Sequence, residues 1–375
     1  MIKLDSIELR EIHLALREPF RISSGEITQR RILLLRLQDT DGLATWSECV
    51  AGERPNYSPE TIDTAWLAIT QWLAPLVLGH GFGKPTEVLD ILSQGIKGHN
   101  MAKAAVEMGL WSLFSLQQGL SLKQLVGGTR DKVATGISLG IQASPGDLAK
   151  KVTEAISAGY ARIKIKIGPG RDLDYVAAAR DAAGAETPLM ADANSAYSLA
   201  DLETLKRLDR YRLMMIEQPL AWDDIFRHAT LQSSLETPIC LDESITDLSR
   251  AEEMVAQKSG RIINIKPGRV GGFGMALRIH DYCLAQKVPV WCGGMLETGI
   301  GRAYNVALAS LPGFTLPGDL SPSRRYWDRD IVSPEWTMDR DGMVKVPDGE
   351  PGLGVTVDGA RIDDLTVRRE TLSVA

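Results

Sequence analysis

Lysines and acidic residues recur at regular intervals in the central part of the chain. The segment RIKIKI holds Lys164 and Lys166, which are two residues apart and therefore on one face of a strand. Four later segments, ADAN, IEQP, CLDE and NIKPG, continue the series with Asp192, Glu217, Asp242 and Lys266. From Lys166 onward, successive members are 24 to 26 residues apart. Because a strand–helix unit of a parallel barrel takes roughly 25 to 30 residues, this spacing predicts that the side chains face one barrel mouth.

These residue types suit the removal of a proton beside a carboxylate. Three carboxylates on adjacent strands would form an all-oxygen site for a hard cation such as Mg²⁺. A substrate carboxylate bound there would lie between the two lysines, and the cations would stabilise the enediolate dianion that forms when the α-proton leaves. A lysine base must be neutral part of the time, so we expect the like charge of Lys164 to lower the pKa of Lys166.

Each of these residues could instead have a structural role. A single charged residue at a strand end is usually a helix cap or part of a surface ion pair, but six at consecutive strand ends are not independent accidents. The glycine-rich run at residues 268–274 lacks the G-x-G-x-x-G spacing of a dinucleotide site, and it follows a lysine. The five histidines show no metal-ligand spacing. A non-catalytic barrel used for binding remains the alternative from a different class.

The elements that must position these residues form an alternating pattern. Eight short apolar runs lie at residues 134–139, 161–167, 188–193, 213–217, 238–242, 262–266, 288–292 and 314–318. Amphipathic stretches of helical length, such as residues 144–158 and 200–208, separate most of them. The runs are apolar nearly throughout, as in strands that are buried on both faces. The pattern therefore predicts a parallel barrel with crossover helices.

The N-terminal part has a different character. Residues 3–16, 31–37 and 44–49 read as strands, and Asp41-Gly42 marks a hairpin turn. Helical periodicity runs from Ser58 to about residue 125, and Ser58-Pro59-Glu60 resembles a helix start. We expect an α+β capping domain at residues 1–128, a catalytic barrel at 129–320 and a tail at 321–375 that returns to the capping domain.

Composition narrows the class of protein. The 375 residues are 44% hydrophobic and 24% charged, with a net charge of −6 and no basic run, so we expect no nucleic-acid partner. The four cysteines are far apart and indicate free thiols in a reducing compartment. No signal-peptide core and no apolar run of roughly 18 residues is present, so we expect no membrane association. These observations together predict a cytoplasmic enzyme.

At its strand-end residues the chain resembles the enolase superfamily, in its muconate-lactonizing branch. The Lys-x-Lys, Asp-x-Asn, Glu-Gln-Pro, Asp-Glu and Asn-x-Lys motifs match in order, and the resemblance covers nearly the whole chain. It implies a (β/α)₇β modified TIM barrel with an α+β capping domain built from the N-terminal part and the tail. Members of this superfamily use a Lys or His base with one or two Mg²⁺ ions.

Within that branch the chain is similar to o-succinylbenzoate synthases that also racemise N-acylamino acids. Four segments carry this similarity, at residues 98–108, 264–272, 290–303 and 311–321. The implied reaction is the dehydration of 2-succinyl-6-hydroxy-2,4-cyclohexadiene-1-carboxylate to o-succinylbenzoate, in menaquinone synthesis. The implied partners are a small carboxylate substrate that bears a succinyl or acyl group, and other copies of the chain in a homo-oligomer.

The resemblance also implies roles for individual residues. Lys166 and Lys266 would form the acid/base pair, and Lys164 would assist. One Mg²⁺ per site, with Mn²⁺ as a substitute, would be held by Asp192, Glu217 and Asp242, supported by Asn194 and Glu243. The substrate pocket would be closed by cap loops around residues 22–25 and 51–57, and its expected members are Ser138, Arg269, Gly294, Met295, Leu296, Tyr57 and Ser24.

Other activities stay open. A dedicated N-acylamino or N-succinylamino acid racemase is the main alternative, because both reactions need nearly the same site. A muconate-type cycloisomerase fits the segments less well. The last strand ends in PGD at Asp319 without the Asp-x-Asp element of dipeptide epimerases, which disfavours a dipeptide substrate.

Overall fold

An antiparallel sheet from both ends of the chain forms one part of the molecule. The computed structural model describes residues 1–22 and 25–374. The strand order is β16-β1-β2-β3, with bounds β1 Ile2–Ile22, β2 Gly25–Asp39, β3 Ala44–Cys49 and β16 Thr366–Ser373. The short β4 (Gly81–Phe82) also pairs with β1. β2 and β3 form the predicted hairpin, with Leu33 opposite Cys49.

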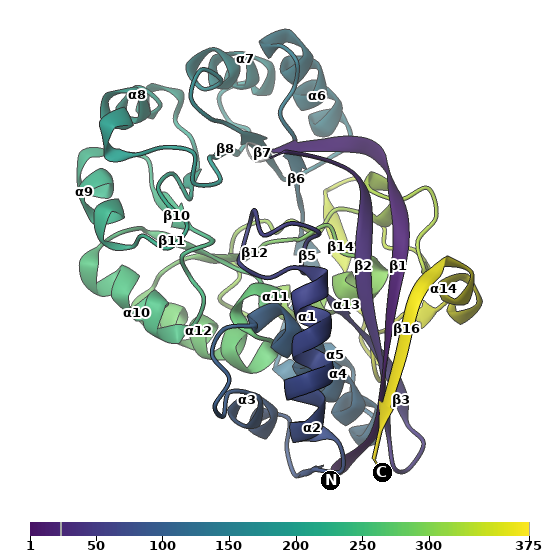
Figure 1. Ribbon diagram of the computed structural model, residues 1–375. Helices are drawn as coiled ribbons and strands as arrows, with labels where there is room; N and C mark the ends of the chain where they lie inside the picture. The colour runs from purple at the N-terminus through teal and green to yellow at the C-terminus, as the bar shows by residue number, and fades with distance from the viewer. Residues whose placement is uncertain (23–24, 375) are drawn as a thin grey trace.

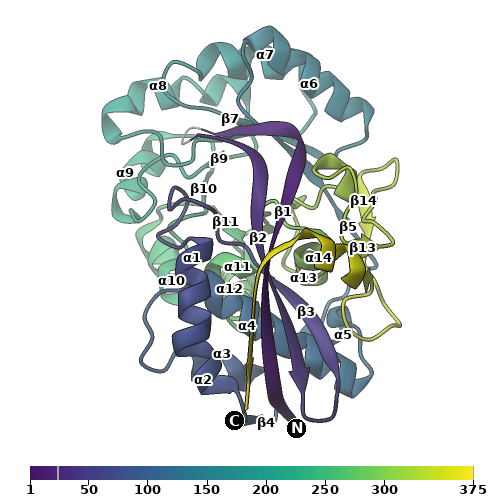
Figure 2. The ribbon, with the colours of Figure 1, turned by 45° about the vertical axis from the view of Figure 1, so that its right-hand side comes forward.

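The β1–β2 hairpin is longer than the sequence pattern indicates. The register runs from Leu4–Asp39 to Ile22–Gly25, with a shift between Ala15 and Phe20. Figures 1 and 2 show this purple hairpin extending from the end where both termini lie to the neighbourhood of β7. The cap therefore reaches the parallel sheet through a continuous two-stranded arm.

Helices pack against the antiparallel sheet. They are α1 (Ile62–Ala68), a π-helical turn at Ile69–Leu73, α2 (Ala74–Val77), α3 (Thr86–Leu92), α4 (Asn100–Gln118) and α5 (Leu122–Val126). The predicted helix start at Ser58 is wrong, because Thr61 caps α1 by accepting a hydrogen bond from the Thr64 amide. The carboxylate of Glu60 instead accepts from the Met101 amide at 2.9 Å, at the start of α4.

Seven parallel strands form a curled sheet, in sequence order. They are β6 (Gly136–Leu139), β7 (Arg162–Lys166), β8 (Leu189–Asp192), β9 (Ile216–Glu217), β10 (Ile239–Leu241), β11 (Ile262–Ile265) and β12 (Val290–Cys292). The predicted eighth strand at residues 314–318 forms isolated bridges only, Phe314 with Val290 and Gly318 with Thr135. Pro317 has no amide hydrogen to donate to a ladder, which explains the missing regular pairing. These bridges still place the segment between β12 and β6.

The crossover helices lie outside this sheet (Figure 1). They are α6 (Pro145–Ser157), α7 (Leu173–Ala183), α8 (Leu202–Lys206), α9 (Phe226–Ser234), α10 (Leu248–Gln257), α11 (Pro267–Val270), α12 (Phe273–Gln286) and α13 (Gly299–Ala309). The predicted helix at 144–158 is confirmed, since Ser144 is the N-cap of α6. The one predicted at 200–208 is shorter and follows a 3₁₀ turn at Leu199–Asp201.

The tail contacts both parts of the molecule. It contains β13 (Val332–Ser333), β14 (Met343–Lys345), β15 (Thr356–Val357) and α14 (Gly359–Leu365) before β16. β14 pairs with β5 (Lys132–Ala134), whereas β16 pairs with β1. The domain boundaries at residues 128 and 320 stay a prediction.

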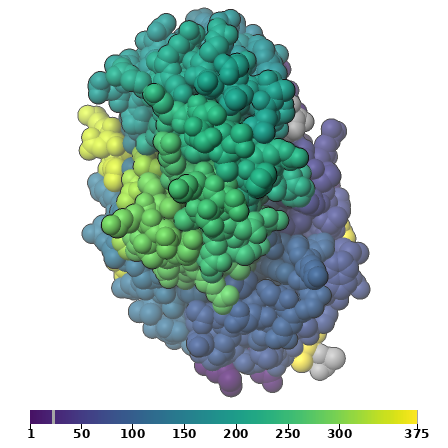
Figure 3. Space-filling model, turned by 90° about the vertical axis from the view of Figure 1, so that its left-hand side faces the viewer, coloured from purple at the N-terminus to yellow at the C-terminus, as the bar shows by residue number. Residues whose placement is uncertain are grey.

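Two large apolar cores stabilise these layers. One joins the parallel sheet, its helices and one face of β1 and β2, and the other joins the opposite face to α1–α4. Figure 3 shows the barrel helices, in teal and green, above the blue and purple cap. The four cysteines are buried and free. Among the described residues, no helix has the length and apolar character needed to cross a bilayer.

Candidate active site

The structure brings the six strand-end residues together. Lys164 and Lys166 lie on β7, Asp192 and Glu217 end β8 and β9, and Asp242 and Lys266 directly follow β10 and β11. Lys166 is the register partner of Asp192, which in turn is the partner of Glu217. All six side chains are buried. Parallel strands end at the same edge of a sheet, so the spacing in the sequence becomes one cluster in space.

Lys166 lies at one side of this cluster. Its Nζ donates to Asp192 Oδ2 and to Asn194 Oδ1, each at 2.6 Å. The Asn194 amide donates to the other Asp192 oxygen at 3.0 Å, and Asn194 Nδ2 donates to Glu243 Oε1 at 3.1 Å. The two residues predicted to support the metal site, Asn194 and Glu243, are thus hydrogen-bonded next to it.

Lys266 directly follows β11, so three strands, β8, β9 and β10, separate it from Lys166 on β7. Its Nζ donates to Asp242 Oδ2 at 2.8 Å and to Tyr57 Oη at 3.0 Å. Tyr57 comes from the cap, and its hydroxyl donates to Asp242 Oδ1 at 2.9 Å. Burial lowers the pKa of Lys266, but the charge of Asp242 outweighs this effect and holds the pKa well above its usual value. The cap therefore contacts Lys266 and Asp242 directly.

Lys164 has more acidic partners than the sequence analysis assigned to it. Its Nζ donates to Glu217 Oε2 at 3.1 Å and to Asp319 Oδ2 at 2.6 Å. Asp319 also accepts from Arg162 Nη2 at 2.5 Å. Burial lowers the pKa of Lys164, but these carboxylates outweigh it and raise the pKa. The sequence analysis missed this role of Asp319, although its place at the end of the eighth apolar run is the same signal that identified the others.

Arg269 lies behind Asp242 and is not among the described residues that line the cavity. Its guanidinium group binds Asp242, donates from Nε to the Ile245 carbonyl at 2.8 Å and donates from Nη2 to the Asn264 carbonyl at 2.6 Å. The expectation that Arg269 binds substrate stays a prediction. In this structure Arg269 positions Asp242.

The carboxylates have the chemistry of a hard-cation site. Glu217 accepts from Asn264 Nδ2 at 2.7 Å, and one oxygen of Glu243 is buried without a hydrogen-bond partner. Burial and repulsion by Asp192 raise the pKa of Glu217 to about 7. A divalent cation among these oxygens would relieve that repulsion.

Basic side chains stand between these carboxylates. Within the described ranges, no three His, Cys, Asp or Glu side chains form a metal cluster. Lys166 and Lys266 each hold one oxygen of a predicted ligand. The predicted ligands Asp192 and Asp242 are thus ion-paired with these two lysines.

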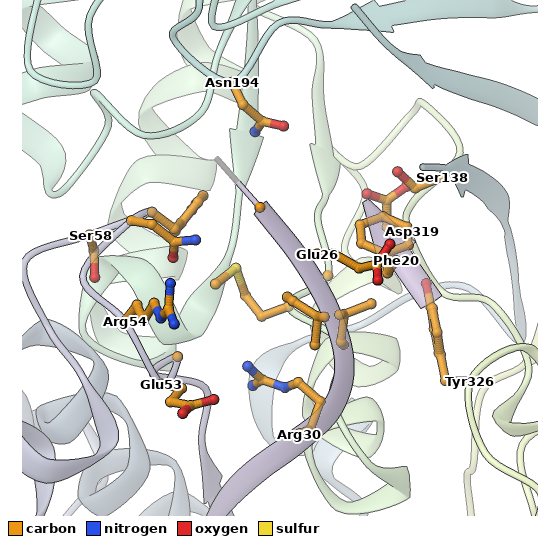
Figure 4. A pocket seen from close by; sticks show the side chains of 18 of the residues that line it. Phe20, Glu26, Arg30, Glu53, Arg54, Ser58, Ser138, Asn194, Asp319 and Tyr326 are labelled. Atoms are coloured by element: carbon orange, nitrogen blue, oxygen red, sulfur yellow. The ribbon is translucent and has the colours of Figure 1, made fainter. Parts of the chain in front are cut away.

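A cavity of about 450 Å³ opens above the cluster, between barrel and cap. Figure 4 shows Glu53, Arg54 and Ser58 on one side and Ser138, Asp319 and Tyr326 on the other. The predicted pocket members that line it are Ser138, Tyr57, Gly294, Met295 and Leu296. Ser24 lies outside the described residues. The cavity also includes Arg30 of β2, which the sequence analysis did not identify.

Comparison with known proteins agrees with this geometry. Residues 6–127 match the mandelate racemase / muconate lactonizing enzyme N-terminal domain, and residues 147–361 match the enolase C-terminal domain-like family. The chain is 45% identical over 365 residues to the o-succinylbenzoate synthase of Geobacillus stearothermophilus, covering 97% of this chain and 96% of that protein. It is 44% identical over 374 residues to the N-succinylamino acid racemase of Thermus thermophilus, covering 100% of both. A crystal structure of an enolase superfamily member from Listeria innocua superposes with a TM-score of 0.95 at 39% identity, covering 100% of both chains.

Proposed function

The chain belongs to the mandelate racemase / muconate lactonizing enzyme family of the enolase superfamily, and on that premise we propose that it is an o-succinylbenzoate synthase with N-succinylamino acid racemase activity. The observation that carries the proposal is the pair of buried lysines, Lys166 and Lys266, separated by three strands whose ends carry carboxylates. The curated relatives described above have these two activities.

In the synthase reaction, Lys166 removes the proton from the ring carbon that bears the carboxylate of 2-succinyl-6-hydroxy-2,4-cyclohexadiene-1-carboxylate. The same lysine then returns this proton to the β-hydroxyl group, which leaves as water, and the ring becomes aromatic. Lys266, held by Asp242 and Tyr57, stabilises the negative charge from the other side. The product, o-succinylbenzoate, places the reaction in menaquinone synthesis.

In the racemase reaction, the second lysine completes the inversion. Lys166 removes the α-proton from one enantiomer, and Lys266 delivers a proton to the opposite face. The two lysines exchange roles for the other enantiomer. This reaction requires one lysine on each side of the carboxylate cluster. The positions of Lys166 and Lys266 therefore favour racemase activity as a second function of the same site.

We propose Mg²⁺ as the cofactor, with Mn²⁺ as a substitute, held by Asp192, Glu217 and Asp242. When bound, the ion supplies positive charge that stabilises the enediolate dianion. Asn194 and Glu243 would orient the ligand carboxylates through the hydrogen bonds described above. An oxygen-only ligand set and the repulsion at Glu217 support this assignment.

Turnover by the purified protein tests the proposal. With Mg²⁺ present, we expect the cyclohexadiene substrate to give o-succinylbenzoate. The loss of diene absorbance measures this reaction. We also expect the optical rotation of N-succinyl-L- and of N-succinyl-D-amino acids to decay to zero as each becomes racemic. Protein treated with a chelator is the control, and readdition of Mg²⁺ should restore both rates. Turnover of neither substrate by the Mg²⁺-loaded protein would refute the assignment.

The partner that this site supports is a small carboxylate with a succinyl or acyl group. A cytoplasmic location, a homo-oligomeric assembly and the absence of a nucleic-acid partner stay predictions.

A further inference from the structure

Arg30 is a buried charged residue next to apolar core residues of β2. It shares one face of β2 with Ile32 and Leu34, both of which belong to the core around the parallel sheet. Only 6% of Arg30 is exposed, and the residue lines the cavity. Burying a guanidinium group is costly unless its charge and its donors are matched.

The charge of Arg30 is compensated by Glu48 and Glu297. Burial lowers the pKa of Arg30, and the fields of these two carboxylates oppose that effect. Their oxygens, however, are engaged at the start of α13. Glu48 accepts from Thr298 Oγ1 at 2.6 Å and from the Gly301 amide at 3.1 Å. The carboxylates thus oppose the effect of burial on Arg30 but are already hydrogen-bonded elsewhere.

Glu297 is engaged in the same way. One oxygen accepts from the Met295 amide at 2.8 Å and from Asn305 Nδ2 at 2.7 Å, and the other lies 3.3 Å from Arg302 Nη2. Within the described part of the chain, Nε and Nη2 of Arg30 are buried without a hydrogen-bond partner. A positive group with unused donors at a cavity wall is a site for an anion.

The other arginines of the cavity wall are less suited to this role. Arg31 is paired with Glu11 at 2.7 Å and with Asp63 at 3.0 Å. Arg54 is exposed on the cap loop, where water competes for its donors. Among these three arginines, Arg30 alone combines burial with unfilled donors.

The position of Arg30 suits a long substrate. Figure 4 shows Arg30 and Asn194 at opposite edges of the ring of lining residues, with the guanidinium group directed toward its interior. Asn194 marks the acid/base end, because its side-chain oxygen is 2.6 Å from Lys166 Nζ. An anion bound by Arg30 would therefore lie away from the reacting carbon.

We propose that Arg30 binds the distal carboxylate of the succinyl group while the proximal carboxylate lies at the acid/base cluster. This inference rests on the proposed function and names the group that recognises the succinyl chain. In the cyclohexadiene and in an N-succinylamino acid, the distal carboxylate is the same number of bonds from the carbon that loses its proton. One arginine therefore serves both substrates, and an N-acetylamino acid, which lacks that carboxylate, does not use it.

The test compares an N-succinylamino acid with the N-acetyl derivative of the same amino acid. The variant Arg30→Met removes the charge and keeps an unbranched side chain. We expect it to raise KM for the N-succinyl substrate roughly ten- to hundredfold, the range of a charge-assisted hydrogen bond. KM for the N-acetyl substrate should change by less than about threefold. Arg36→Met is the matched control, because Arg36 lies on the same strand outside the cavity.

Three outcomes would overturn the proposal. These are an equal change for both substrates, no change for either, or loss of discrimination in Arg54→Met with none in Arg30→Met. If Arg30→Met does not fold, the same KM comparison is made with Arg30→Lys and with the wild-type protein. Equal wild-type KM values for the two substrates would also refute the role of Arg30.

Binding separates this proposal from the proposed function. Calorimetry with the Mg²⁺-loaded protein measures the affinity for the N-succinyl and N-acetyl compounds without turnover. If the wild type turns over neither compound but prefers the N-succinyl one, and Arg30→Met or Arg30→Lys loses that preference, the proposed function fails and the role of Arg30 stands. If the wild type turns over both compounds but binds them equally well, the proposed function stands and the role of Arg30 fails.

Discussion

Gly293, directly after β12, leaves the space that the Lys266 side chain occupies. A Cβ atom at this position would lie 2.6 Å from Lys266 Cε and 2.3 Å from Asn264 Oδ1. Carbon atoms pack at about 3.5 Å, so Gly293→Ala requires Lys266 to move by roughly 1 Å. A displacement of that size can lower a rate on the order of a hundredfold. We expect racemisation of N-succinylamino acids to fall by about this factor, because inversion needs Lys266.

The assay follows both racemisation and the exchange of the α-proton in D₂O for each enantiomer. The atoms nearest to the new methyl group belong to Asn264 and Lys266 and not to Lys166, so exchange should persist for the enantiomer whose proton faces Lys166. Overpacking at a buried site costs about 1–3 kcal/mol of stability, so the unfolding midpoint must be measured as well. Gly359→Ala is the control, because a Cβ there meets nothing within 4 Å. Racemisation within about threefold of wild type in Gly293→Ala would refute the reasoning.

Three further predictions concern the base, the cation and pH. Lys166→Ala should lower synthase and racemase turnover together by roughly 10²- to 10⁴-fold with folding intact, and substantial retained activity would contradict its role. Mg²⁺ at about 100 times its Kd should stabilise the wild type by about 2.7 kcal/mol in urea unfolding, and equal stabilisation of Glu217→Gln would argue against this ligand. Burial lowers the pKa of His228 to about 4, and its Nε2 accepts from the Leu220 amide. The neutral ring therefore contributes stability that is present above pH 6.5 and is lost as pH falls toward 4, by roughly 3 kcal/mol. Urea unfolding of His228→Gln should show a flatter dependence over this range, and an unchanged slope would contradict it.

Strand-end chemistry was the part of the site most open to prediction. A parallel sheet converts an even spacing in sequence into a common edge, so Lys166, Asp192 and Glu217 could be placed without coordinates. Tyr57 was expected in the pocket, but its bridge between Lys266 and Asp242 depends on how the cap packs on the barrel. No pattern along the chain encodes a contact between segments about 200 residues apart.

The misjudged residues have local signals that compete with tertiary partners. Ser58 resembles a helix cap, yet Thr61 takes that position because Glu60 is drawn to the amides of α4. Asp319 ends the eighth apolar run. Its hydrogen bond to Lys164 forms only because the curled sheet brings this run close to β7. Arg30 directly precedes Ile32 and Leu34 on one face of β2, which gives no signal of a substrate contact, and its missing hydrogen-bond partners are seen only in the folded structure.

The pairing of β1 with β16 has a consequence for how the chain reaches this structure. Ser6 is opposite Ser373, so the edge of the cap sheet closes through contacts that span almost the whole described chain. During synthesis β1 emerges long before β16, and loop closure over such a distance is slow. Until then β1 presents an open edge, the kind of surface that pairs with other chains. The charged residues Glu8, Arg10 and Glu11 along that stretch would discourage such pairing until β16 is synthesised and pairs with β1.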